Sequence, residues 1–583
     1  MSNKKSAQAR KPKKTNKTKQ SIQPGALASS KSLIKLGLSE LSKFIKAQRD
    51  AYPVIVFSLL PSLSFWGGAN VTELTLPLMI RPLLVSAITG LLIYCGLYFA
   101  LGRSKYKASI LAIIAVLAAF LYRYIYIEYK DLVISLFGPK TDIQVHSYFM
   151  WLLLILFIAL AVLVKRKLKF SARIRNYLAL LATMLLVFNL YPIIRQWLGT
   201  RDLKNIEFGS PVQTVPGRAK STTPDIYYII PDRYANQKVL KDVYKFDNSP
   251  FLDNLKKKGF YVAENSAANY PFTSFSVASS LNLDYLPDKL KDRPENGLFT
   301  SLLHNAMEDN QVVDFLDRQG YTFINIGPWW NPTKYNKHAD QNLYNPTGVI
   351  VLNKKIDMQE HELLLFQDTI FWQFSKKAIK IRGRTLYGRT YPSGDSSGRS
   401  IHRQTALHQF ATLKKISKEP GPKFIFSHIL QPHDPYVFDE SCRNMPRSTE
   451  HEYKLYIKQL KCTNARIQAT VDTILRGSPR PPIIVIQADE GPYPIEFRKN
   501  KELDWSTAPT SLLHQKEKIL NMYYFPDRNY EQLYHNISPV NTFRIIFNQY
   551  FGTDLPLFKD RHFFSEKRSK RFTIIEVTDK FKD

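Results

Sequence analysis

Residues 51–200 are more continuously apolar than the rest of the chain. Five apolar stretches lie near residues 53–72, 82–102, 108–127, 147–164 and 176–195. Each is close to the length that an α-helix needs to cross a bilayer core. The first is the weakest, because Pro61 and two glycines interrupt it. The pattern predicts a transmembrane domain of about five helices over residues 51–197.

The charges between these stretches alternate in a way that predicts an orientation. The connections after the second and fourth stretches are basic and carry Arg103, Lys105, Lys107, Lys165, Arg166, Lys167, Lys169, Arg173 and Arg175. The other two connections are nearly balanced in charge. Because short cytoplasmic loops hold the excess of Lys and Arg, the N-terminus is expected inside the cell. An odd number of spans then makes this a multi-pass protein of the cell (inner) membrane, with its C-terminal domain on the extracytoplasmic side.

Residues 1–50 carry 13 Lys or Arg against Glu40 and Asp50. This segment has too little apolar surface to offset the entropy that ordering would cost. We therefore predict a basic, largely disordered cytoplasmic tail. The tail either attracts anionic lipids or is simply solvated. Residues 31–48 show roughly helical apolar spacing, which suggests an interfacial helix.

From residue 225 onward, short apolar runs alternate with helical patterns. The runs cover residues 225–231, 321–327, 423–430 and 482–487, and helical patterns cover residues 251–258, 312–319 and 455–475. Alternation of this kind predicts an α/β domain with a mainly parallel sheet covered by helices. We expect a linker over 198–223, the exported domain over 224–565, and a C-terminal strand or tail over 566–583.

Polar clusters follow these apolar runs. Asp232 follows the first run, His433 the third, and Asp489 and Glu490 the fourth. Ligands of open α/β sheets collect beyond the carboxyl ends of the strands. The clusters therefore indicate a metal-assisted hydrolase site.

The net charge of +32 does not indicate nucleic acid. The first 200 residues hold 27 basic and 6 acidic side chains, which leaves 54 and 43 for the rest. The exported part is thus only mildly basic and has no dense basic stripe, so nucleic acid is not an expected partner.

Two cysteines, Cys442 and Cys462, lie 20 residues apart in the exported part. In an oxidising compartment they would close a disulfide, and otherwise they remain two free thiols.

Four sequence motifs of the exported domain resemble one family. They are Pro-Asp-Ile-Tyr-Tyr-Ile-Ile-Pro-Asp at 224–232, Asn-Tyr-Pro-Phe-Thr-Ser-Phe-Ser-Val-Ala-Ser-Ser-Leu-Asn at 269–282, Gln-Pro-His-Asp-Pro-Tyr at 431–436 and Gln-Ala-Asp-Glu-Gly at 487–491. In this order they resemble the sulfatase branch of the alkaline phosphatase superfamily over about residues 224–550. The layout of five spans and an exported domain is most similar to lipoteichoic acid synthases and phosphoethanolamine transferases.

The resemblance implies a divalent metal (Mn, Mg, Ca or Zn) held by Asp232, Asp489 and Glu490, with Thr273 as the nucleophile. Such a metal lowers the pKa of a hydroxyl and neutralises phosphoryl charge. Glu490 departs from the family pattern, which usually has His there. The alternatives are that Asp232 is a turn or cap residue, and that Thr273 only bonds locally in a Ser/Thr-rich helix start where Ser274 is the substitute nucleophile.

The resemblance also implies roles for three flanking residues. His433 would contact the transferred group or the leaving oxygen, although a structural role in its Pro-rich turn is the alternative. Asn282 would bind substrate, and so would Arg233, which itself departs from the family pattern of an acid or a small residue after the first Asp and could instead neutralise Asp232. His428, inside the apolar run, is expected to be a core histidine.

These residues predict a membrane-anchored phosphotransferase or phosphodiesterase. Its partners would be membrane lipids, with a lipid headgroup donor and an envelope acceptor. The pattern Cys/Ser-x-Pro-x-Arg of formylglycine sulfatases is absent, since residues 273–277 read Thr-Ser-Phe-Ser-Val. The rival hypothesis is a degenerate, non-catalytic sulfatase-like protein that binds or scaffolds in the envelope.

Overall fold

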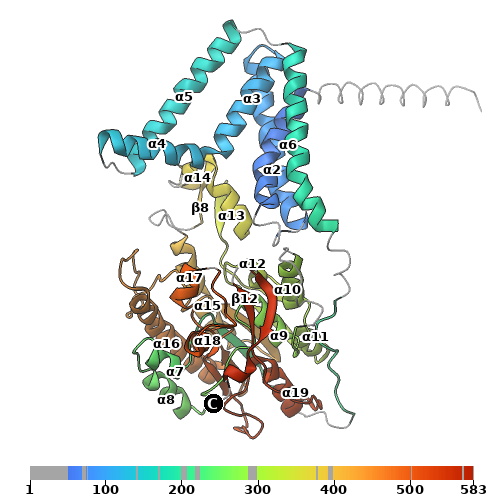
Figure 1. Cartoon of the computed structure of the whole chain (residues 1–583), viewed down its shortest axis with the longest axis vertical. Coiled ribbons are helices and arrows are strands. Elements are labelled where there is room, and N and C mark those ends of the chain that lie inside the picture. The colour runs from blue at the N-terminus through green and yellow to red at the C-terminus, as the bar shows by residue number, and fades with distance from the viewer. Residues whose placement is uncertain are drawn as a thin grey trace, which may run out of the picture.

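The computed structural model describes residues 50–68, 74, 76–138, 142–167, 171–198, 206–216, 223–286, 298–375, 379–390, 398–500, 502–567 and 570–581. The basic tail and the helix expected over 31–48 lie outside the described residues. Figure 1 shows the apolar helices at one end of the molecule and the α/β domain at the other, with α13 and α14 between them.

The N-terminal part is helical. Its helices are residues 50–67, α2 (Leu76–Ala100), α3 (Lys105–Phe120), α4 (Tyr122–Phe137), α5 (Asp142–Arg166) and α6 (Ala172–Leu198). Within the described residues, α2, α5 and α6 are long and apolar enough to cross a membrane, and the pair α3 and α4 would be a fourth span if counted as one. The helix over 50–67, at the stretch that we considered weakest, is not among them.

The third expected span differs from the structure in its second half. The chain bends by 69° between α3 and α4 at Leu121, where one continuous helix over 108–127 was expected. The sequence of α4 contains Arg123, Glu128, Lys130 and Asp131, so it is less apolar than α3. A helix of that composition is suited to lie along a membrane surface rather than across its core.

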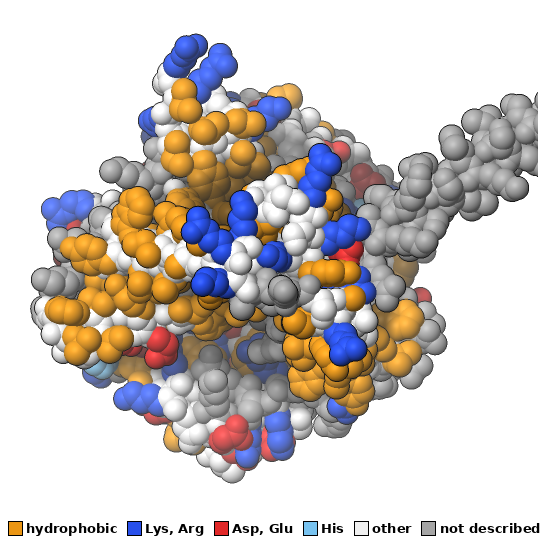
Figure 2. Space-filling view, turned by 90° about the horizontal axis from the view of Figure 1, so that it is seen from above, with side chains coloured by type: hydrophobic (Ala, Val, Ile, Leu, Met, Phe, Trp, Pro, Cys, Tyr) orange, Lys and Arg blue, Asp and Glu red, His pale blue; other side chains and the backbone are white. Residues whose placement is uncertain are grey.

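The basic loops gather at one end of the helices. There Asp50 accepts a bond from Arg175 at 2.7 Å and lies 3.6 Å from Lys105, while Lys107 donates to the carbonyl of Lys165 at 2.8 Å. Figure 2 looks onto the molecule from this side and shows Lys and Arg side chains gathered over hydrophobic ones. The charge arrangement agrees with the predicted orientation.

The described part of the linker, residues 206–216, is not helical and lies against the α/β domain. The backbone N–H of Val215 bonds to Gly552 at 3.0 Å, Arg318 donates to the carbonyl of Val212, and Val212 is buried. The segment therefore anchors the domain where it leaves α6.

The α/β domain is built on a seven-stranded sheet in the order β2-β11-β10-β1-β9-β3-β4. Its strands are β1 (Ile226–Pro231), β2 (Tyr261–Val262), β3 (Thr322–Asn325), β4 (Gln341–Asn342), β9 (Lys423–Ile429), β10 (Ile483–Gln487) and β11 (Asn521–Tyr524). The strand β1 pairs in parallel with β10 and β9, and only β11 makes antiparallel pairs. The predicted mainly parallel sheet is confirmed.

Helices cover both faces of the sheet. The helices of the domain are α7 (Gln237–Asp242), α8 (Ser249–Lys257), α9 (Thr273–Leu281), α10 (Leu298–Glu308), α11 (Gln311–Arg318), α12 (Asn331–Lys334), α15 (Arg399–Ile416), α16 (Glu452–Gly477), α17 (Ile495–Lys499), α18 (Thr510–Glu517) and α19 (Thr542–Phe551), with 3₁₀ turns at Pro539–Asn541 and Thr578–Phe581. One core lies under α9, α10, α11 and α19, and the other under α7, α8, α15 and α16.

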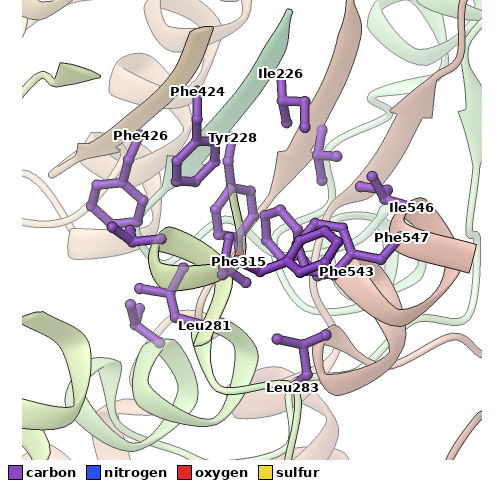
Figure 3. Close-up of a cluster of buried hydrophobic side chains, with 14 of the residues drawn as sticks. Ile226, Tyr228, Leu281, Leu283, Phe315, Phe424, Phe426, Phe543, Ile546 and Phe547 are labelled. Atoms are coloured by element: carbon purple, nitrogen blue, oxygen red, sulfur yellow. The ribbon is translucent and has the colours of Figure 1, made fainter. Parts of the chain in front are cut away.

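The central strand β1 contributes to both cores. Tyr228 and Ile226 face the first core, which Figure 3 shows, and Tyr227 and Ile229 face the second. Both faces of β1 are therefore buried, which explains the unbroken apolar run that begins at residue 226. Each buried aliphatic side chain contributes roughly 1.5–3 kcal/mol of transfer free energy.

A second, four-stranded antiparallel sheet in the order β6-β5-β8-β7 was not foreseen. Its elements are β5 (Gly348–Val351), β6 (Lys354–Asp357), β7 (Ile379–Ile381) and β8 (Arg384–Arg389), with α13 (Glu360–Gln367) and α14 (Ile370–Ser375) between β6 and β7. We call residues 348–389 the insert. Figure 1 shows it reaching from the α/β domain to the helices.

The C-terminal segment is a strand pair rather than a loose tail. The strands β12 (Phe563–Lys567) and β13 (Lys570–Glu576) form an antiparallel hairpin, and Phe572 packs against Phe275 of α9. The hairpin thus begins before residue 566 and supports the helix that carries Thr273.

The two cysteines of the exported domain form the disulfide Cys442–Cys462. Of the two alternatives that the sequence left open, a disulfide and two free thiols, the structure has the disulfide.

Candidate active site

Three polar residues meet at the carboxyl ends of the central strands. Asp232 directly follows β1, Asp489 lies two residues beyond β10, and His428 is the sixth residue of β9. Because β1 lies between β10 and β9, with Ile229 opposite Ile486 and Ile230 opposite His428, the three side chains reach the same point. The strand order therefore creates a cluster from residues that are up to 257 positions apart in the sequence.

The cluster has the geometry of a metal site. The ligand atoms of Asp232, His428 and Asp489 all lie within 4.8 Å of one another. The Nε2 atom of His428 is 3.9 Å from Asp232 Oδ2 and 4.0 Å from Asp489 Oδ2. All three residues are buried, and no hydrogen-bond partner is found among the described residues for Asp232 Oδ1, His428 Nε2 or either Asp489 side-chain oxygen. Buried polar atoms without partners are costly, so a bound cation would satisfy them.

Burial determines the protonation of these groups. It raises the pKa of Asp232 well above its ordinary value, and the neighbouring Asp489 carboxylate adds to that rise. The pKa of Asp489 is also raised by burial. Burial lowers the pKa of His428 to about 3, so its imidazole is neutral and Nε2 is available as a ligand once Nδ1 carries the proton. Two buried carboxylates that resist ionising together are a typical arrangement of a functional site.

Sequence reasoning missed His428 because it lies within a fully buried strand. The expected burial is correct, but only its Nδ1 is satisfied, by the Thr333 hydroxyl at 3.0 Å. The indole of Trp330 contacts the imidazole edge to face, with ring centroids 5.8 Å apart. The sequence signal for His428 is its place near the carboxyl end of an apolar run, two residues before that run ends. Asp232 lies near the corresponding end of the neighbouring strand β1.

Thr273 lies beside this cluster as the first residue of α9. Its hydroxyl is close enough to Asp489 to oppose the rise in the pKa of that carboxyl, although neither Asp489 oxygen makes a hydrogen bond of regular geometry. The helix start thus places the Thr273 hydroxyl next to the buried Asp489 carboxyl.

Glu490 is occupied by two cations. Arg233 donates to its Oε1 at 3.0 Å, and Lys516 lies 2.8 Å from the same oxygen. Its Oε2 atom has no hydrogen-bond partner among the described residues. Glu490 is therefore not part of the Asp232, His428 and Asp489 cluster, and its place as a predicted metal ligand goes to His428 in the observed geometry.

Arg233 bridges two acids with a left-handed backbone conformation. Its φ is 60°, and the guanidinium contacts Glu490 on one side and Asp434 at 2.9 Å on the other. A non-glycine residue in this region costs about 1 kcal/mol or more and is common at functional sites. Arg233 also opposes the rise in the pKa of Asp232. Its positive charge lies close to the cluster, where it could meet a phosphoryl group.

His433 lies beyond Arg233, outside the cluster. It lines a small depression with Arg233, Tyr493 and Arg498, and its Nδ1 is bonded to the carbonyl of Asp434. Burial and the Arg233 charge lower the pKa of His433 well below its ordinary value. The imidazole is thus neutral.

The structure does not bring Asn282 to the site. It caps the far end of α9, nine residues beyond Thr273, and its amide donates to the carbonyls of Ala278 and Ala306, both at 2.8 Å. Asn282 therefore joins α9 to α10 in the core.

Three solved structures that resemble this chain are distant from it in sequence. The C-terminal periplasmic domain of EptC from Escherichia coli, in complex with Zn, is 12% identical with a TM-score of 0.38 and covers 59% of this chain and 87% of that one. The C-terminal periplasmic domain of the phosphoethanolamine transferase EptC from Campylobacter jejuni is 10% identical (TM-score 0.35, 60% and 95% covered). A protein of the alkaline phosphatase superfamily from Vibrio parahaemolyticus is 12% identical (TM-score 0.37, 64% and 81% covered).

No curated protein matches the sequence. The model of the Sulfatase family matches residues 224–543, which is more than half of the chain and includes all four motifs. The resemblance inferred from the motifs is thereby confirmed, and the chain belongs to the sulfatase family.

Proposed function

We propose that the protein is a membrane-anchored, metal-dependent phosphotransferase or phosphodiesterase that uses Thr273 as its nucleophile. Its substrate would be a lipid headgroup or an envelope glycan. Membership of the sulfatase family supports phosphoryl or sulfuryl transfer in general. The observation that carries the proposal is the buried cluster of unsatisfied ligand atoms with the Thr273 hydroxyl beside it.

The residues present fit a divalent metal. Asp232, Asp489 and His428 would hold it through two carboxylate oxygens and one neutral imidazole nitrogen. A set that includes an imidazole nitrogen suits Zn²⁺ better than Mg²⁺, Ca²⁺ or Mn²⁺, which prefer oxygen ligands. When bound, the metal would lower the pKa of a hydroxyl and neutralise phosphoryl charge.

The chemistry proceeds in two displacements. The Thr273 Oγ loses its proton and forms a bond to phosphorus, while the ester bond to the lipid or glycan oxygen breaks and that oxygen takes up a proton. Water or an acceptor hydroxyl then attacks the phosphothreonine, which restores Thr273. Arg233 would bind the equatorial oxygens of the phosphoryl group. The neutral His433 is better suited to accept a proton from the incoming hydroxyl than to protonate the leaving oxygen, the role first expected of it.

Two features support phosphoryl over sulfuryl chemistry. Residues 273–277 lack the formylglycine pattern, so an unmodified hydroxyl is the available nucleophile. The apolar helices α2, α5 and α6 would hold the domain at a membrane, where phosphate esters are abundant. We place the domain on the extracytoplasmic side of the cell (inner) membrane, in agreement with the basic end of the helices and the disulfide.

The pairing of Glu490 with two cations favours the alternative of a non-catalytic protein. Because Arg233 and Lys516 pair with Glu490, that carboxylate is held by protein cations instead of joining the ligand cluster, as expected of a non-catalytic binding or scaffold protein. Metal content separates the two functions.

The test compares full-length protein with two variants. We expect stoichiometric metal in the unaltered protein and in Thr273→Ala, and loss of metal in Asp489→Ala. Hydrolysis of a phosphodiester lipid should disappear in both variants. Metal-free protein would favour the scaffold function, whereas turnover retained by Thr273→Ala would remove that residue as the nucleophile.

A further inference from the structure

A large apolar cavity lies between the membrane helices and the insert. Its volume is about 1040 Å³, at the upper end of the roughly 300–1,000 Å³ typical of small-molecule pockets. One wall comes from the helix over 50–67, α2, α3 and α4, and includes Phe57, Leu60, Val85, Phe120 and Ile125. The opposite wall comes from α13, α14 and the second sheet. We call this the interdomain cavity.

Two ion pairs join the helices to the insert, and three of their four residues, Arg81, Glu362 and Asp368, line the interdomain cavity. Arg81 pairs with Glu362, and Arg123 pairs with Asp368 at 3.0 Å. In each pair the arginine is the more exposed partner, at 53% against 7% for Glu362 and 51% against 23% for Asp368. At the cavity the more exposed charge of the Arg81 pair is therefore positive, which complements the phosphate of a membrane lipid.

A smaller and more polar cavity of about 360 Å³ lies on the other side of α13. Phe65 lines both cavities, and on α13 the side chains alternate: Glu362 and Leu365 line the interdomain cavity, and His361 and Leu364 line the polar one. The two spaces therefore adjoin along one helix of the insert.

The polar cavity reaches the shell of the candidate active site. Asn331 and Lys334 of α12 and the neighbouring Trp330 line it. Trp330 packs on the imidazole of His428, and Thr333 of α12 bonds to the Nδ1 atom of His428. A continuous series of contacts thus leads from bilayer-facing helices to the metal cluster.

We propose that the interdomain cavity binds the acyl chains of a membrane phospholipid, whose headgroup extends past α13 into the polar cavity and toward Trp330. The acyl chains match the apolar walls, and the phosphate of the lipid matches the exposed guanidinium of Arg81. This inference rests on the proposed function, because it identifies the substrate as a lipid that enters from the membrane. The insert is then the part of the soluble domain that recognises the lipid body.

The test uses full-length protein in nanodiscs that contain a phosphatidylethanolamine with a diazirine on one acyl chain. We expect light to cross-link this probe to peptides of α2 and the insert. Val85→Trp, which fills the cavity, should reduce those cross-links several-fold. The matched control is Val162→Trp on α5, a valine that is 46% exposed against 57% for Val85 and does not line the cavity, and it should leave them unchanged.

A competition experiment and a catalytic variant complete the test. Unlabelled phosphatidylethanolamine should compete with the probe, and soluble glycerophosphoethanolamine should not. Thr273→Ala should cross-link like the unaltered protein, so failure of the catalytic proposal and failure of lipid binding give different results. Cross-links confined to the outer surfaces of α5 and α6, or cross-links in the insert that Val85→Trp leaves intact, would overturn the proposal.

Discussion

At the residue scale, the site depends on which atom of His428 remains available. Its Nδ1 is bonded to Thr333 and its Nε2 faces the two aspartates. In His428→Asn the amide can keep the Thr333 bond but cannot reach the aspartates. We expect metal affinity to fall by more than the roughly 10–100-fold that loss of a hydrogen-bonded outer partner produces. Metal titration with a competing chelator measures this.

The control for that variant is His433→Asn. His433 lies outside the metal cluster, so its replacement should leave metal affinity unchanged and affect turnover alone. Equal loss of metal in both variants would mean that the imidazole of His428 is not a ligand.

The places of Asp232 and Asp489 could be predicted because each follows an apolar run, where chain direction limits the place of a side chain, whereas the role of Thr273 rests on the family resemblance and stays a prediction. The surroundings of Glu490 and His428 could not be predicted. Their roles depend on Lys516 and on the pairing of β9 beside β1, which no local pattern encodes. Asn282 lay in a predicted motif, yet the length of α9 carries it to the core.

At the element scale, the strands that show no polar alternation were the easiest to predict. The runs over 225–231, 423–430 and 482–487 each match an observed strand to within one residue at either end. The insert was not predicted, because β7 is largely exposed and its short strands lack a continuous apolar face. The bend between α3 and α4 was also missed, since Leu121 carries no proline or glycine signal.

The disulfide fixes the connection between the His433 turn and α16. It joins Cys442 to Cys462, and in the chain-entropy model a loop of about 20 residues contributes roughly 3 kcal/mol. We expect the double variant Cys442→Ser, Cys462→Ser to lower the free energy of unfolding by about that amount, measured by denaturant titration. Cys95→Ser, which changes the free cysteine, should have no such effect. Identical denaturant unfolding curves for the double variant with and without reductant would confirm that loss of the disulfide causes its lower stability.

At the scale of the whole molecule, the C-terminal hairpin is tied back to the segment that leads to Thr273. His562, next to β12, donates from Nδ1 to the carbonyl of Ala268 at 2.8 Å and stacks on Phe581 with ring centroids 4.6 Å apart. The chain end thus supports the site from a distance of almost 300 residues in sequence.

The burial of His562 makes stability depend on pH. Burial lowers the pKa of His562 to about 4, below the roughly 6.5 of an unfolded histidine. Between these values the unfolded chain binds more protons than the folded one, so stability is complete above about pH 6.5 and falls as the pH decreases toward 4. A shift of this size corresponds to at most roughly 3 kcal/mol. In His562→Asn, the amide can keep the bond to Ala268 without titrating. We therefore expect a lower melting temperature at pH 7.5 but a smaller loss between pH 7 and 5 than in the unaltered protein, measured by thermal unfolding in detergent. If the melting temperatures of the unaltered protein and of His562→Asn fall in parallel as the pH decreases, groups other than His562 set the acid sensitivity.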